Sequence, residues 1–145
     1  MSDISGAGLK ITIIASATFP QGFTVTEFAS DTDPFIVEDV QVTQSEVGVN
    51  GDMVSWHRAT IIPAEINVIP KTESDKNLKI LVNANREAKN KMRVHDDIRI
   101  IASYPDGTVT TLKGGVVSEG SIAESVTNDG KIRSKNYKFQ FPSVI

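Results

Sequence analysis

The chain of 145 residues contains no cysteine. This absence excludes disulfide frameworks, catalysis by a thiolate and zinc sites with cysteine ligands. No apolar run approaches the roughly 18 consecutive residues of a membrane-spanning helix. The amino terminus, MSDISGAG, lacks the basic and then apolar pattern of a secretory signal peptide. We therefore expect synthesis in a cytoplasm and no membrane among the partners of the protein.

Basic residues are missing between Lys10 and Arg58. Residues 1–70 carry a formal charge of −7 and residues 71–145 carry +4, which gives −3 for the whole chain. The acidic residues within the base-free stretch are Glu27, Asp31, Asp33, Glu38, Asp39, Glu46 and Asp52. The sequence pI of about 5.3 argues against general nucleic-acid binding. A chain polarised in this way is suited to head-to-tail contact with copies of itself, or to an acidic surface facing a molecule that it must not hold.

Catalytic and metal-binding motifs are also missing. His57 and His95 have no metal-ligand spacing between them, and no GxSxG nucleophile motif occurs. The Asp31–Asp33 segment has two carboxylates that could bind calcium, but it lacks the glycine and the distal glutamate of a calcium loop. Trp56 is either a sugar-stacking platform or, in the reading we favour, an anchor of the core or of an interface. We predict that the protein is not an enzyme and uses no cofactor or metal.

Strand patterns dominate the rest of the sequence. The predicted strands cover residues 9–19, 23–29, 35–49 (with a bulge at Glu38–Asp39), 53–69 (as one strand or two bent at Pro63), 92–103, 108–117 and 131–141. Turn patterns occur at Pro20–Gly22, Asn50–Gly51 and Tyr104–Gly107. In the last strand, Tyr137, Phe139 and Phe141 share one face.

A single helix is predicted over about residues 73–90. Thr72 and Asp75 form a variant of the capping box, and basic residues near the end suit the helix dipole. The stripe that this helix is expected to turn inward consists of Leu78, Leu81, Val82 and Asn85, at i, i+3, i+4 and i+7. We find no repeat and no linker, so residues 1–145 are predicted to form one domain. Its predicted class is mainly β, an antiparallel β-sandwich or barrel with one flanking α-helix.

A family resemblance rests on several segments that follow one another along the chain. These are the acidic loop 31–35, the turn segment 48–54 with Trp56 two residues on, the segment 66–70 that leads into 75–81 and 83–86, and the ending GGVVSEGSIAESVTNDGKIRSKNYKFQF. The sequence resembles small tail tube proteins of contractile-tailed bacteriophages, some of which carry the label of tail fibre or structural protein.

The resemblance implies a β-sandwich-like subunit, related in fold to the tube proteins of type VI secretion systems. It implies that six copies form a ring and that rings stack into a hollow tube, through which DNA passes without sequence-specific binding. The implied partners are other copies of the chain, the contractile sheath protein, the baseplate or tube initiator and the tail terminator. The implied location is the tail of the virion, after synthesis in the cytoplasm of a bacterial host.

Two sets of candidate residues follow from these expectations. An acidic and polar lining would repel DNA phosphates, and the candidates for it are Thr24, Thr26, Glu27, Glu38, Asp39, Gln41 and Thr43. The candidate contacts between subunits are Asp31, Asp33, Asp52, Trp56, Arg58 and Arg86. Strand edges rich in Ile, Val and Thr also need to be covered, and pairing between subunits would cover them.

An alternative of another class is a carbohydrate- or partner-binding β-sandwich module of a phage fibre or baseplate. It would use Trp56 and Tyr104 as stacking platforms and the Asp31–Asp33 loop for calcium.

Overall fold

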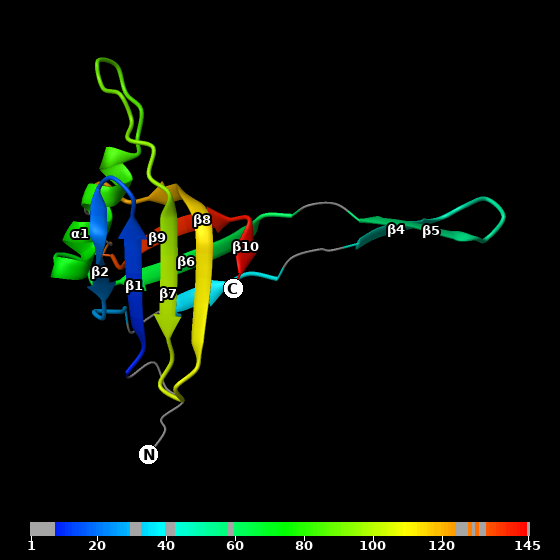
Figure 1. Cartoon of the computed structure of the whole chain (residues 1–145), viewed down its shortest axis with the longest axis horizontal. Helices are drawn as coiled ribbons and strands as arrows, with labels where there is room; N and C mark the ends of the chain where they lie inside the picture. The colour runs from blue at the N-terminus through cyan, green and yellow to red at the C-terminus, as the bar shows by residue number, and fades with distance from the viewer. Residues whose placement is uncertain are drawn as a thin grey trace.

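The computed structural model describes residues 8–29, 33–39, 43–57, 60–123, 128, 130 and 133–144. In this part of the chain, six strands precede one helix and four strands follow it (Figure 1). The elements are β1 (Lys10–Ala15), β2 (Phe19–Val25), β3 (Phe35–Val37), β4 (Thr43–Val47), β5 (Met53–His57), β6 (Ile62–Val68), α1 (Glu73–Ala84), β7 (Ile98–Ser103), β8 (Val109–Gly120), β9 (Lys135–Phe141) and β10 (Ser143–Val144).

The main sheet has the strand order β2-β1-β7-β8-β9-β6-β3, with β10 on the side of β8. All its pairings are antiparallel. β8 belongs to two layers, because its first part pairs with β7 and its second part pairs with β9. Figure 1 shows β1, β7 and β8 side by side, with β9 and β6 crossing behind them. The predicted mainly β fold with one helix is confirmed.

The change of layer along β8 occurs at a pair of glycines. Gly114 has a positive φ of 72°, and a Cβ atom on Gly115 would lie 2.3 Å from the ring of Phe141. The ring therefore occupies the space that any larger residue at position 115 would need. These two glycines allow one strand to form the corner between the layers.

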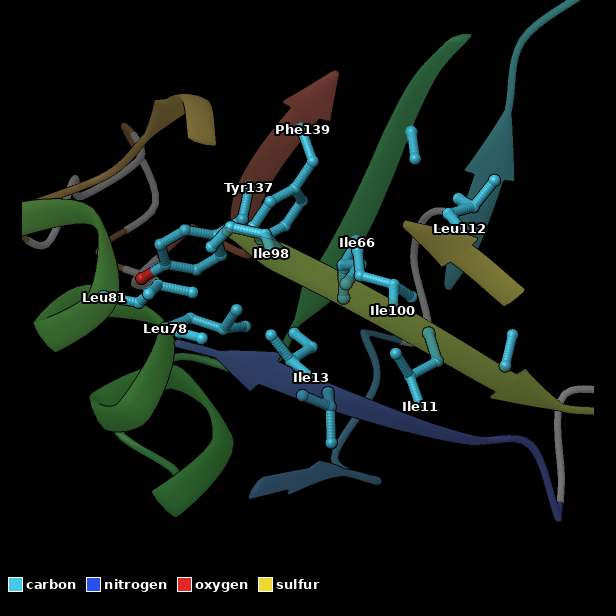
Figure 2. Close-up of a cluster of buried hydrophobic side chains, with 14 of the residues drawn as sticks. Ile11, Ile13, Ile66, Leu78, Leu81, Ile98, Ile100, Leu112, Tyr137 and Phe139 are labelled. Carbon is cyan, nitrogen blue, oxygen red and sulfur yellow. The ribbon is translucent and has the colours of Figure 1, made fainter. Parts of the chain in front are cut away.

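The core lies between the two layers and is closed at one end by α1 (Figure 2). It forms because alternate residues of each strand point inward, as in the pattern of exposed and buried positions along β1. Its largest apolar side chains are Ile11, Ile13, Ile66, Leu78, Leu81, Ile98, Ile100, Leu112, Tyr137, Phe139 and Phe141. Full burial of such a side chain stabilises the fold by about 1.5–3 kcal/mol. The predicted inward face of the last strand is confirmed. In the predicted helix stripe, Leu78, Leu81 and Val82 are buried, whereas Asn85 is the C-cap and only half-buried.

The helix begins where the sequence predicts but ends earlier. Thr72 is the N-cap, and its Oγ1 accepts a hydrogen bond from the Asp75 N–H at 3.3 Å. The helix ends at Ala84, because Asn85 donates its side-chain N–H to the Leu81 carbonyl and the Val94 N–H returns to the Ala84 carbonyl at 2.8 Å. The predicted continuation to about residue 90 is wrong, and the last turn holds no basic residue.

The reversal between β1 and β2 also differs from the prediction. Pro20–Gly22 lies inside β2, and the chain turns at residues 16–18 instead. The Asp96 carboxylate accepts hydrogen bonds from the N–H groups of Ala17 and Thr18 at 2.7 and 2.9 Å, which holds the turn at this position.

The central predicted strands are shorter than expected. Residues 35–49 hold two strands, β3 and β4, so Glu38–Asp39 follows a strand end and is not a bulge within one strand. Residues 53–69 hold β5 and β6, and Pro63 lies within β6 opposite Gln140. Before β7, residues 92–97 form no strand. Among the described residues, no helix is long and apolar enough to span a membrane.

Candidate assembly surfaces

A two-stranded hairpin projects from the body of the molecule (Figure 1). We call residues 43–57 the hairpin arm; it consists of β4 and β5, which form a sheet of their own. Its tip is the turn that Asn50–Gly51 predicts. Gly51 has a positive φ of 85° and donates its N–H to the Gly48 carbonyl at 2.9 Å, and Gly48 donates to the Asp52 carbonyl at 2.7 Å. The tip is therefore well formed without support from the body.

The hairpin arm exposes apolar side chains on both of its faces. Val47 and Met53 are opposite each other and are 74% and 71% exposed, and Val49 at the tip is fully exposed. On the other face, Val54 and Trp56 are 58% and 41% exposed. A lone hairpin is at best marginally stable in water, and a soluble protein rarely presents so much apolar surface without a partner for it. The arm is thus suited to being covered by another surface.

The charge of the hairpin arm is acidic. It contains Glu46 and Asp52, and it contains no lysine or arginine. Both acidic residues lie among the exposed apolar ones, so the surface combines hydrophobic contact area with negative charge. A partner for this surface is expected to be apolar and positively charged.

The predicted inter-subunit residues fall into separate groups. Asp52 and Trp56 lie on the hairpin arm, whereas Arg86 follows α1 at the other end of the molecule (Figure 1). Asp33 is exposed just before β3, and its carbonyl accepts a hydrogen bond from the Asn67 side chain at 2.7 Å. Asp31 and Arg58 lie outside the described residues.

The predicted lumen residues lie along the two edges of the main sheet. Thr24 is exposed on β2, the first edge strand, and Thr26 is exposed just after it. Glu38 and Asp39 are exposed after β3, the other edge strand, and Thr43 is half-buried at the start of the hairpin arm. Gln41 lies outside the described residues. Most of these residues therefore lie on or beside β2 and β3. Within the described chain, no other strand pairs with the outer edge of either one.

Glu27 has a local role in addition. Its Oε2 accepts a hydrogen bond from the Ser74 N–H at 3.3 Å, in the first turn of α1. A carboxylate at this position stabilises the helix, because the free N–H groups of the first turn carry partial positive charge. The side chain is half-buried there.

A network around Asp96 was missed by the sequence pattern. Burial raises the pKa of this carboxyl, but hydrogen bonds from Thr18, Asn85 and Ala17 outweigh burial and hold the pKa below its usual value of 3.8. The network joins the β1–β2 turn to the segment after the helix, and Asn85 donates to Asp96 Oδ2 at 2.8 Å. His95 instead lies beside Arg93, with 3.0 Å between its Nδ1 and the guanidinium. Within the described ranges, no group of three His, Asp or Glu side chains is placed to hold a metal ion.

Comparison with solved structures identifies similar folds at low sequence identity. The sheath/tube terminator of an extracellular contractile injection system in its extended state has a TM-score of 0.54 and 13% identity, covering 100% of this chain and 96% of that one. A chain of the sheath–tube complex of the same kind of system has a TM-score of 0.52 and 13% identity, covering 93% and 86%. A chain of the tube-terminating cap of the anti-feeding prophage has a TM-score of 0.53 and 12% identity, covering 93% and 85%. At this identity the likeness shows a shared fold.

Sequence comparison gives the family. No curated protein shows a significant match to this chain. One family model, described as tail fiber protein gp32, matches residues 2–145. Because the match covers nearly the whole sequence, the chain belongs to the family of the tail fiber protein gp32.

Proposed function

We propose that this protein is the subunit of a tail tube, which assembles into stacked hexameric rings inside a contractile sheath and forms the channel for DNA ejection. The family is one of phage tail proteins, and the fold is shared with chains of a sheath–tube complex and of a sheath/tube terminator. The partners under this proposal are other copies of the chain, the sheath, the baseplate or tube initiator and the tail terminator. The protein performs no chemistry in this role.

The observation that carries the proposal is the hairpin arm. It projects from a compact sandwich and presents apolar side chains that the described chain leaves uncovered, including Val47, Val49 and Met53. A projecting arm that contacts a different surface of an identical neighbour makes a heterologous interface, and repetition of such an interface produces rings or filaments. Tubes built from stacked rings need interfaces of this kind.

Charge supports the passage of DNA. The exposed residues Thr24, Thr26, Glu38 and Asp39 lie on or beside the edge strands β2 and β3 and include no base. If neighbouring copies pair along these edges, the polar and acidic side chains beside them border the closed surface. Phosphates are repelled by carboxylates and bind chiefly to lysine and arginine, so such a surface would let DNA slide without holding it.

Electron microscopy of the purified protein and of virions tests the proposal. We expect rings or tubes in concentrated protein and this chain in the tube of the virion tail. The double variant Val47→Ser/Met53→Ser should lose assembly while keeping its fold, because both side chains lie on the arm. Val109→Ser, which changes an exposed valine at the β7–β8 turn, is the matched control and should assemble normally. Absence of this chain from the tail tube of virions would refute the proposal.

A second candidate is a binding module of a tail fibre, which the description of the family favours. Trp56 is 41% exposed on the hairpin arm, where an aromatic ring can stack on a sugar. Binding to a glycan array that is lost in Trp56→Ala, with an unchanged unfolding temperature, would support this function. Location of the chain in fibres and not in the tube would support it as well.

A further inference from the structure

Four basic residues gather on one projecting loop at the end of the molecule opposite the hairpin arm (Figure 1). We call residues 86–93 the basic loop; it follows α1 and carries Arg86, Lys89, Lys91 and Arg93. Its acidic residue, Glu87, has a carboxylate 3.5 Å from Arg93. Lys89 is exposed, and the Arg86 guanidinium donates only to the side chain of its neighbour Asn83 among the described residues. The Lys91 ammonium donates to the Arg86 carbonyl, which leaves its charge without a carboxylate partner there. The loop therefore presents a net positive surface whose charges are largely uncompensated within the described chain.

A hollow with apolar walls lies directly beside the basic loop. It has a volume of about 440 Å³ and lies between the end of α1 and the last part of β8. Val82, Val117 and Ile122 supply apolar lining, Arg86 stands at its side, and Ile122 is 49% exposed. A second hollow, lined by Arg93 and Val116, adjoins the first because both share Asn85 and Val117. The acidic side chains in the lining are Glu119 in the first hollow and Asp96 and Asp97 in the second. Glu119 pairs with Lys138 at 3.6 Å, and the Asp96 carboxylate accepts hydrogen bonds from Ala17, Thr18 and Asn85, so these two charges are already engaged within the chain. We call the two hollows and the adjoining basic loop the basic end; the apolar part of its lining is in the first hollow, and Arg86 and Arg93 stand at its sides.

The basic end and the hairpin arm are complementary in two properties. The arm offers Val47, Val49 and Met53 together with Glu46 and Asp52. The basic end offers Val82, Val117 and Ile122 in a hollow of mixed lining, together with the arginine and lysine side chains of the basic loop. Complementary charge steers two such surfaces together and excludes pairing of like with like. Because the two surfaces lie at opposite ends of one molecule, the arm of one copy faces away from its own basic end (Figure 1). A second copy supplies the matching surface.

We propose that the hairpin arm of each copy docks into the basic end of the next copy, with Glu46 and Asp52 against the basic loop. This inference rests on the proposed tube function, because it names the surface that receives the arm. The contact is heterologous, so each copy donates one arm and receives one arm, and the assembly grows in one direction. The hydrophobic part of the contact comes from the arm tip against Val82, Val117 and Ile122 in the first hollow, and the charges set its partner and orientation.

Charge reversal tests the docking site. The arm variant Glu46→Lys/Asp52→Lys and the loop variant Arg86→Glu/Lys89→Glu each place like charges against each other. With two exposed ion pairs lost, each worth up to about 1 kcal/mol, we expect the concentration needed for assembly to rise by about tenfold or more. The chain that carries all four substitutions restores opposite charges and should assemble within about threefold of the unchanged protein.

The control has the same net charge as the four-substitution chain, but its two basic-to-acidic substitutions lie away from the basic loop. It combines the arm variant with Lys10→Glu/Lys113→Glu, which are exposed positions on β1 and β8. We expect this chain to remain as defective as the arm variant alone. Circular dichroism and the unfolding temperature of each monomer establish that all variants are folded.

Assembly is measured by sedimentation of concentrated protein and by the share of each variant incorporated into virions. Normal assembly of the loop variant, or a four-substitution chain no better than its net-charge control, overturns the docking site. If the unchanged chain still forms tubes in that case, the tube function stands and only the receiving surface is wrong. If the unchanged chain is absent from the tail tube, the proposed function itself fails.

Discussion

The hydrogen bond between Tyr137 and Asp75 leads to a stability prediction of defined size. Tyr137 lies fully buried on β9, and its hydroxyl points toward α1 (Figure 2). The hydroxyl donates to Asp75 Oδ1 at 2.6 Å, and Asp75 is only 1% exposed. The other carboxylate oxygen accepts from the Lys71 N–H at 2.9 Å. One buried carboxylate therefore ties the start of the helix to the second layer of the sandwich.

The substitution Tyr137→Phe removes this donor and keeps the ring. No other donor among the described residues reaches Asp75 Oδ1, so the variant leaves one buried carboxylate oxygen without a hydrogen bond. A hydrogen bond to a charged group contributes about 1.5–3 kcal/mol, and an unsatisfied buried group costs a similar amount. We therefore expect the free energy of unfolding to fall by about 2–3 kcal/mol. For a chain of this length the unfolding temperature should fall by about 5–10 °C.

The measurement is urea unfolding and thermal unfolding of dilute protein, followed by circular dichroism. Tyr104→Phe is the matched control, because this ring is half-buried and the described residues make no hydrogen bond to its hydroxyl. We expect the control to change the free energy of unfolding by less than about 0.5 kcal/mol. A Tyr137→Phe variant as stable as the control would show that the buried hydroxyl contributes nothing, and the reasoning would be wrong.

Three further changes test other parts of the fold. Asp96→Asn should destabilise the protein at neutral pH. The hydrogen bonds that lower the pKa of the Asp96 carboxyl stabilise the fold at pH values above the ordinary 3.8, and this stabilisation is lost as the pH falls through the lowered pKa. In urea titrations from pH 7 to pH 2, the difference in the free energy of unfolding between the variant and the unchanged protein should therefore disappear. Gly115→Ala should lower the free energy of unfolding by about 1–3 kcal/mol in the same assay, because the new Cβ would lie 2.3 Å from the Phe141 ring. Gly48→Ala on the hairpin arm is its control and should lower it far less, because a Cβ there would meet no atom closer than 3.5 Å. Thr72→Ala removes the N-cap and should cost about 1 kcal/mol; an unchanged midpoint would contradict the capping role.

The features that the sequence predicts correctly are those set by near neighbours in the chain. Asn50–Gly51 forms a turn because glycine adopts positive φ at no steric cost, and Thr72 begins the helix because its hydroxyl lies next to the N–H groups that it caps. The alternation along residues 135–141 places Tyr137 and Phe139 in the core for the same local reason. Each of these is decided within a few residues.

The features that the sequence misplaces depend on distant contacts. The β1–β2 turn lies at residues 16–18 and not at Pro20–Gly22, because Asp96 binds the Ala17 N–H from 79 positions away. The end of the helix depends on Asn85, whose side chain bonds to the Leu81 carbonyl and to Asp96, 11 positions further along and itself held by the β1–β2 turn. Local turn propensity carries no information about such partners, so the pattern Pro-Gln-Gly indicated a turn that the tertiary structure places elsewhere.

The candidate assembly residues show the same division. Asp52 and Trp56 were predicted as inter-subunit contacts and lie on the hairpin arm, but the sequence of the arm has the alternation of an ordinary core strand. Only its position outside the body shows that its apolar residues are uncovered. The lumen role of Thr24 and Glu38 stays a prediction, because it depends on how copies are arranged around an axis.

The base-free stretch connects sequence, fold and assembly. In the structure it supplies both edge strands, β2 and β3, and the whole hairpin arm, which are the elements most open to pairing with other chains. Exposed edges and apolar hairpins otherwise associate without specificity. The acidic residues of this stretch lie on the hairpin arm (Glu46 and Asp52) and beside the edge strands (Glu27, Glu38 and Asp39), and no base accompanies them. Two copies of these elements therefore repel each other, and in the proposed docking the basic loop of another copy is the attractive partner. Under the proposed docking, the uneven charge of the chain would favour ordered head-to-tail growth over aggregation. High salt, which screens exposed charges, should then weaken that selectivity before it weakens the fold.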